Sequence, residues 1–217
     1  MRKALTIIEL IFSIVIIGIV FTVTPRLMMS MNQSAKTTIK EEAMYDAMAQ
    51  IGLIVNLPWD NNNTINPQIL GVTSGASEYD CNNTTGYRIG GFVGGRNCIE
   101  PAGINHNASV LMGMEDEKYN DIDDYHDTNI SVDKNCSGAV KGLFRIATMV
   151  TYVDDPTSFG NVTLSAASKA ANQSSNSKRV LVRVGYGLDS KQTGCITSLE
   201  YHSFNIGHIQ INSRTWN

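Results

Sequence analysis

Residues 5–23 read LTIIELIFSIVIIGIVFTV, and Glu9 is the only ionisable side chain among them. A helix of this length rises about 28 Å, which matches the hydrocarbon thickness of a lipid bilayer. Arg2 and Lys3 precede the run, and positive charge is retained on the cytoplasmic side of a membrane. The pattern therefore predicts a single membrane span, with the N-terminus in the cytoplasm and the rest of the chain outside it.

Two interpretations of the apolar run compete, a cleaved secretory signal and a retained anchor. A secretory signal has a shorter apolar core that ends in a small-x-small cleavage site, whereas Thr24, Pro25 and Arg26 follow this run. The sequence therefore favours a retained anchor. Glu9 is informative because a carboxylate inside an apolar span is costly and usually has a partner or a function. Alternatively, its side chain reaches the nearby cytoplasmic interface.

The rest of the chain differs sharply from this block. The whole sequence has 217 residues, of which 42% are hydrophobic and 17% are charged, and its formal net charge is −3. Outside the apolar run it is polar and rich in Asn, Ser, Thr and Gly. This uneven distribution excludes a plain cytosolic globule and a multi-span membrane protein. The acidic balance gives no sign of direct nucleic-acid binding.

Helical periodicity continues beyond Pro25. Apolar residues recur every three or four positions, at Met28, Met31, Ala35, Ile39, Ala43, Ala47, Ile51 and Ile54. The spacing predicts one long helix over residues 5–57, about 80 Å in length, whose second half is amphipathic. We expect a kink or a loosened turn at Pro25, and Pro58 marks the end of the helix.

The C-terminal third predicts an antiparallel sheet. Three runs rich in β-formers cover residues 142–153, 179–186 and 196–204, and residues 209–211 are a shorter fourth candidate. Residues 165–177 are small and polar and predict a flexible loop. One face of the first run carries its larger apolar residues, Phe144, Ile146, Val150 and Tyr152. A long helix followed by adjacent strands predicts an α+β fold in which the helix packs on the sheet.

The beginning of the sequence resembles the processing signal of type IV pilins and type II secretion pseudopilins. In that family a basic leader ends in a small residue, and the mature chain begins with an apolar residue, Thr, two aliphatic residues and Glu. The stretch Lys3-Ala4-Leu5-Thr6-Ile7-Ile8-Glu9 follows this order. It departs from the usual pattern at Ala4, where the family prefers Gly, and at Leu5, where it prefers Phe.

The resemblance implies that residues 1–4 are a leader, which a prepilin peptidase removes between Ala4 and Leu5 before the new amine of Leu5 is methylated. It implies that residues 5–24 anchor the chain in the lipid bilayer and later form an assembly interface. Glu9 then pairs with the N-terminus of a neighbouring pilin or pseudopilin subunit. Residues 58–217 become a periplasmic head domain, and an inner-membrane assembly platform is a further partner.

An acidic segment lies within the expected head domain. Residues 115–133 hold eight Asp or Glu residues and one Lys. Clustered carboxylates need water or a cation, and calcium takes several oxygen ligands in flexible acidic loops. Two hypotheses stay open, a solvated loop and a calcium site at Asp121, Asp123 and Asp124. This Asp-rich string is similar to one in minor pilins of the mannose-sensitive haemagglutinin type.

The chain has four cysteines and no Cys-x-x-Cys pair, so neither a zinc ribbon nor a redox motif is expected. An even number of cysteines in an exported domain favours disulfides. Among the three pairings we expect Cys81–Cys98 and Cys136–Cys195, and free thiols are the alternative.

The sequence carries no catalytic arrangement of the usual kinds, because its four histidines lack nucleophile or metal spacing. We therefore predict a structural subunit rather than an enzyme, with no cofactor apart from the calcium hypothesis. The resemblance implies a minor component of a type IV pilus or of a type II secretion pseudopilus. The alternatives are a generic membrane anchor and a membrane-anchored periplasmic adhesin or enzyme that does not polymerise.

Overall fold

The computed structural model describes the chain in seven stretches, residues 6–62, 69–79, 107–115, 118–127, 144–156, 164–187 and 194–206. The chain forms two compact units, Met1–Glu42 and Ala43–Asn217. Helix α1, Ile7–Ile54, contributes to both units, so that each unit is described by itself.

The first unit contains the apolar part of α1. Its large apolar side chains are exposed on every side of the helix, as the exposed fractions of 81% at Ile7 and 76% at Phe21 illustrate. The helix is long and apolar enough to span a membrane, as the sequence predicts. It continues through Pro25, which has no N–H to offer the carbonyl of Phe21. In the turn before Pro25, the Thr24 hydroxyl donates to the carbonyl oxygen of Val20 at 2.7 Å.

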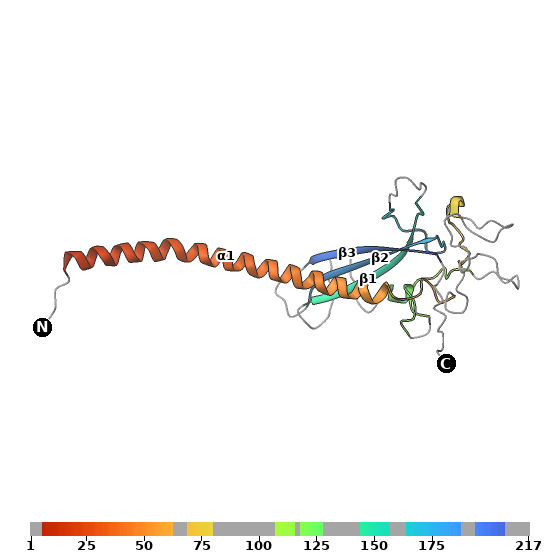
Figure 1. Cartoon of the computed structure of the whole chain (residues 1–217), viewed down its shortest axis with the longest axis horizontal. Helices are drawn as coiled ribbons and strands as arrows, with labels where there is room; N and C mark the ends of the chain where they lie inside the picture. The colour runs from red at the N-terminus through yellow and green to blue at the C-terminus, as the bar shows by residue number, and fades with distance from the viewer. Residues whose placement is uncertain are drawn as a thin grey trace, which may run out of the picture. The chain divides into compact units, whose positions relative to one another are not determined.

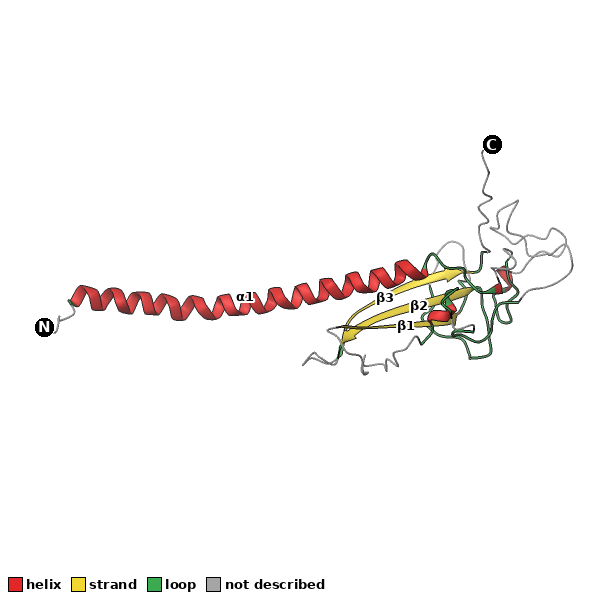
Figure 2. Ribbon diagram, turned by 90° about the horizontal axis from the view of Figure 1, so that it is seen from below, coloured by secondary structure: helices red, strands yellow, loops and turns green. Residues whose placement is uncertain are grey.

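The second unit contains a three-stranded antiparallel sheet in the order β1-β2-β3 (Figure 1). Its strands are β1, Phe144–Val153, β2, Ser177–Tyr186, and β3, Cys195–Phe204. The three predicted strands are thus confirmed, whereas the fourth candidate at residues 209–211 lies outside the described residues. Two short 3-10 helices accompany the sheet, η1, Ser77–Tyr79, and η2, Asp123–Tyr125, and Figure 2 shows them with the strands.

The core of this unit joins the last turns of α1 to one face of the sheet. Ala43, Ala47 and Ile54 of α1 are fully buried and belong to one apolar cluster with alternate residues of β1 and β2. Those strand residues are Val150, Tyr152, Val180, Val182 and Val184, and Phe144 and Ile146 pack against them. The predicted apolar face of β1 and the α+β arrangement are therefore confirmed.

The loop between β1 and β2 differs in part from the prediction of a flexible segment. Ser174, Ser175 and Asn176 at its end are buried. The carbonyl oxygen of Ser174 accepts a hydrogen bond from the N–H of Ser74 at 2.8 Å, and the Asn176 side chain donates to Asp155 at 3.0 Å. Small polar residues are typical of a surface loop, but here their short side chains satisfy buried backbone groups, since the Ser174 hydroxyl accepts a hydrogen bond from the N–H of Thr73 and the Ser175 hydroxyl donates to the carbonyl oxygen of Val153.

Replacing Ile54 by Ala tests the packing of the last turn of α1 in the apolar cluster. We expect the free energy of unfolding to fall by about 2–5 kcal/mol, because the lost methyl groups leave a cavity in a fully buried site. Leu53→Ala is the control, since Leu53 is 61% exposed, and it should stay within about 0.5 kcal/mol of the parent. Denaturation of the full chain in detergent, followed by tryptophan fluorescence, measures both. Equal losses would contradict this packing.

Candidate functional site

A buried ammonium group lies at the beginning of β2. Lys178 is the second residue of that strand, and its side chain is completely buried. Its Nζ donates to Asp123 Oδ1 at 2.6 Å and to the carbonyl oxygen of Trp59 at 2.7 Å, and it lies 3.4 Å from Asp60 Oδ2. A lysine is rarely buried without such partners, because its charge loses the solvation that water provides. We refer to Lys178, Asp60, Asp121 and Asp123 as the Lys178 cluster.

Aromatic rings complete the surroundings of the Lys178 ammonium. Nζ lies 4.1 Å from the centroid of the Trp59 ring and 5.3 Å from that of Tyr152. Both distances are in the range of cation–π attraction, which strengthens when water is excluded. The Tyr152 hydroxyl donates to the carbonyl oxygen of Ser109, so that its polar end is satisfied and its ring is held toward the cluster.

Two loop segments bring the acidic side chains to Lys178, and a third, at Ser109, supports one of them. Asp60 follows α1 closely and accepts hydrogen bonds from the N–H groups of Ser109 at 2.8 Å and Asn62 at 3.0 Å. The N–H of Ile122 donates to the carbonyl oxygen of Pro58 at 3.1 Å, which ties the acidic segment to the end of α1. Asp60 therefore has a structural role in addition to its proximity to Lys178.

Asp121 and Asp124 stabilise the turn that presents Asp123. Asp124 Oδ2 accepts hydrogen bonds from the N–H groups of Asn120 at 2.7 Å and of Asp121 at 3.1 Å. In return, Asp121 Oδ1 accepts one from the N–H of Asp124 at 3.1 Å. This reciprocal pattern satisfies backbone donors at the beginning of η2, as acidic side chains commonly do in turns.

Burial raises the pKa of two carboxyl groups in the Lys178 cluster. Burial raises the pKa of Asp121 from its ordinary value of 3.8 to about 8, and the charge of Asp123 adds to this rise. Burial also raises the pKa of Asp123, although Lys178 opposes that rise. The Asp121 side chain also opposes the rise in the pKa of Asp123. At neutral pH Asp121 is therefore a proton donor beside the Asp123–Lys178 pair.

The structure corrects one of the two hypotheses for the acidic segment. Asp121, Asp123 and Asp124 are each about 1% exposed, so a solvated loop is wrong for these residues. Lys178 supplies the positive charge that a calcium ion supplies in the other hypothesis. In the part of the chain that the structure describes, no three His, Cys, Asp or Glu side chains converge as a metal ligand set. Calcium binding stays a prediction.

Lys178 and Asp60 are not among the predicted site residues, although the sequence carries one signal for Lys178. In a strand, residues two apart lie on the same face, and Lys178 is in phase with the core residues Val180, Val182 and Val184. A lysine in phase with a buried row predicts a buried ammonium. Asp60 had no such signal, since it is 118 residues away from Lys178 in the chain.

The other predicted site residues are described only in part. Ala4, Leu5, Cys81, Cys98 and Cys136 lie outside the described residues. Glu9 lies in the first turn of α1 with its side chain exposed. Cys195 begins β3 and is disulfide-bonded rather than a free thiol. Its partner is not among the described residues, so the expected pairing stays a prediction.

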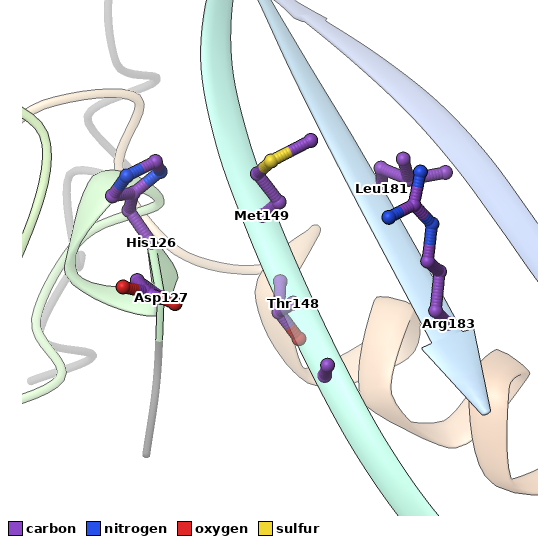
Figure 3. Close-up of a pocket in the computed structure, with 7 residues that line it drawn as sticks. His126, Asp127, Thr148, Met149, Leu181 and Arg183 are labelled. Atoms are coloured by element: carbon purple, nitrogen blue, oxygen red, sulfur yellow. The ribbon is translucent and has the colours of Figure 1, made fainter. Parts of the chain in front are cut away.

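Two pockets flank the turn that follows η2. One, of about 190 Å³, lies beside β1 and β2 and is lined by His126, Asp127, Ala147, Thr148, Met149, Leu181 and Arg183. Figure 3 shows His126 and Asp127 on the turn, with Met149 and Arg183 on the neighbouring strands. The other, of about 330 Å³, is lined partly by Tyr152 and Lys169.

The turn beside these pockets is held to the edge of β1. The N–H of Asp127 donates to the carbonyl oxygen of Thr148 at 3.1 Å, and the His126 Nδ1 atom hydrogen-bonds to the carbonyl oxygen of Val150. The His126 ring therefore helps to cover the strand edge, and these contacts assign it a structural role.

Comparisons of this chain with protein-family models, with curated proteins and with solved structures gave no match. Function is therefore argued from the residues and their geometry.

Replacing Lys178 by Met tests the Lys178 cluster. We expect a loss of about 3–5 kcal/mol in the free energy of unfolding, because buried carboxylates lose their positive partner. Lys169→Met is a matched control, since Lys169 also pairs with a carboxylate, Asp154, at 2.6 Å, but Asp154 is 61% exposed. That variant should lose about 1 kcal/mol or less. Chemical denaturation measures both, and similar losses would contradict the effect of burial.

The raised pKa of Asp121 predicts that stability falls as pH rises. The folded chain holds this proton up to about pH 8, whereas the unfolded chain releases it near pH 3.8, so the free energy of unfolding decreases across this interval. Asp121→Asn does not ionise and should flatten the slope, and the exposed Asp127 supplies the control Asp127→Asn. Denaturation midpoints measured at several pH values check this. Parallel slopes for Asp121→Asn and the parent would refute the shift.

Proposed function

We propose that this chain is a pilin-like structural subunit that is processed from a prepilin and assembled into a filament. The observation that carries the proposal is the exposed apolar part of α1, with Glu9 in its first turn and the processing motif before it. An apolar helix surface of this extent requires cover, which lipid provides before assembly and neighbouring helices provide afterwards. The same surface therefore supports both an anchor and an assembly interface.

Glu9 has a specific place in this proposal. Its side chain lies among exposed apolar residues, among them Ile8 and Leu10. When the helix packs among apolar neighbours, an unpaired carboxylate there loses its solvation. The α-amine of a processed neighbour, which carries a positive charge, offsets this cost. Such a pair fixes the position of one subunit relative to the next, because at any other relative position the Glu9 carboxylate has no positively charged partner.

The second unit suits the role of an exported head. Its core is built on antiparallel strands and is reinforced by the Lys178 cluster and by a disulfide at Cys195. We propose an inner-membrane protein with a single span, a cytoplasmic N-terminus and a periplasmic head, which then enters a type IV pilus or a type II secretion pseudopilus as a minor component. Its partners are a prepilin peptidase, other subunits and an inner-membrane assembly platform.

The proposal is tested first at the N-terminus of the mature protein. We expect mass spectrometry to find a chain that begins at N-methylated Leu5 and lacks residues 1–4. Glu9→Ala should leave membrane insertion intact and reduce incorporation into sheared filaments at least tenfold, because the carboxylate that pairs with the neighbouring amine is gone. Glu42→Ala, which removes an exposed carboxylate from the same helix outside the apolar part, is the control.

Two outcomes would overturn the proposal. An intact N-terminus, or cleavage beyond Pro25, would exclude processing of the prepilin type. Equal incorporation of Glu9→Ala and Glu42→Ala would exclude the pairing role of Glu9. A correctly processed protein that stays in the membrane fraction and never enters filaments would instead support an anchored protein that does not polymerise.

A further inference from the structure

The pocket of about 190 Å³ beside β1 and β2 combines two opposite charges with apolar side chains. Its charged lining residues are Asp127, on the turn after η2, and Arg183, on β2. Figure 3 shows them on opposite sides of β1. Among the described residues, neither the Asp127 carboxylate nor the Arg183 guanidinium forms an ion pair. The pocket therefore suits a ligand that supplies both missing charges.

We propose that this pocket binds a free α-amino acid with an apolar side chain. The α-carboxylate of the ligand accepts hydrogen bonds from the Arg183 guanidinium, and its α-ammonium donates to the Asp127 carboxylate. Its side chain packs against Met149 and Leu181, which line the same pocket. This binding site belongs to the second unit alone and does not depend on whether the chain assembles into a filament.

The register of the sheet places Arg183 among the apolar lining residues. Arg183 is the cross-strand partner of Ala147, and Leu181 is the cross-strand partner of Met149. Because alternate residues of a strand share a face, these four residues lie on the face of the sheet opposite to the apolar cluster. A guanidinium presents several N–H donors in one plane, which fits the two oxygens of a carboxylate.

The turn that carries Asp127 has an unusual backbone conformation. In the part of the chain that the structure describes, Asp127 is the only non-glycine residue with a positive φ, of 52°. Its N–H donates to the carbonyl oxygen of Thr148 at 3.1 Å, which holds the turn against the edge of β1. Residues in such sparsely populated conformations persist where surrounding contacts hold them, and they are frequent at ligand sites. The Asp127 side chain itself remains exposed.

His126 adds a hydrogen-bond acceptor beside Asp127. The Nδ1 atom of His126 hydrogen-bonds to the carbonyl oxygen of Val150, and a carbonyl oxygen only accepts, so Nδ1 carries the hydrogen. In the neutral ring the lone pair is therefore on Nε2. An α-ammonium has three N–H donors, so it can donate to His126 as well as to the Asp127 carboxylate.

The volume and the charges of the pocket favour an amino acid over other classes of ligand. Pockets for drug-sized ligands have volumes of roughly 300–1,000 Å³, so a pocket of about 190 Å³ suits a smaller molecule. An inorganic anion in the pocket faces the Asp127 carboxylate, and a metal cation faces the Arg183 guanidinium. Because like charges reduce affinity, a small zwitterion is the ligand that matches both residues.

Isothermal titration calorimetry of the full chain in detergent, with L-leucine as the probe, tests the proposal. We expect saturable binding to one site per chain. Three analogues each lack one group: isocaproate lacks the ammonium, isoamylamine lacks the carboxylate and glycine lacks the apolar side chain. Each analogue should bind at least tenfold more weakly than leucine, because one of the three contacts is lost.

Two conservative variants test the charged residues. Arg183→Gln and Asp127→Asn remove a charge but keep a polar side chain, and Asn readily adopts the positive φ of Asp127. Each should weaken leucine binding at least tenfold and change the free energy of unfolding little, because neither side chain is buried. Lys118→Gln and Asp154→Asn make equivalent changes at exposed positions outside the pocket, and they should bind leucine as the wild type does.

Four outcomes count against the proposal. A wild-type chain without saturable leucine binding would overturn it. Isocaproate or isoamylamine that binds as tightly as leucine would replace the zwitterion by a ligand of a single charge. Equal affinity for glycine and leucine would refute the contact with Met149 and Leu181. Unchanged leucine binding by Arg183→Gln or Asp127→Asn would place the amino acid elsewhere on the chain.

Discussion

The buried ammonium of Lys178 is the constraint on which much of the second unit depends. A charge that is removed from water must be compensated by oriented partners, and these partners come from distant segments of the chain. Trp59 and Asp60 lie in the segment directly after α1, and Asp123 lies in η2. The strand that carries Lys178 is thereby connected to the end of the helix and to the acidic segment. Removal of the ammonium would leave like charges facing one another in a dry interior.

The two units differ in how far their apolar side chains are covered. In the second unit, alternate residues of β1 and β2 cover one another and the last turns of α1. In the first unit, the apolar side chains of α1 remain exposed, because no other residue that the structure describes in that unit covers them. The core of the second unit is complete within one chain, whereas the exposed helix surface of the first unit is what the proposed lipid or subunit contacts would cover. This contrast is the physical basis for the function proposed above.

The sequence predicted the regular elements well. The helix and the three strands follow from periodicity, since hydrophobic spacing of three to four residues and of two residues reports local geometry directly. Val150 and Tyr152 were assigned to the buried face of β1 for the same reason. The loop before β2 was predicted less well. Ser174 and Asn176 have the composition of a surface loop, but their burial depends on partners at Thr73, Ser74 and Asp155 that local sequence does not indicate.

By itself, the sequence determined an apolar helix with one carboxylate at Glu9, a sheet of three strands and an acidic segment that needs compensation. These features depend on neighbours along the chain. Only the tertiary structure decided what compensates the acids, because Lys178 and Asp60 are separated from Asp123 by 55 and 63 residues. Burial of a charge is a property of the whole assembled unit. The acidic segment, for which the sequence suggested water or calcium, is buried, and its Asp123 pairs with the single lysine Lys178.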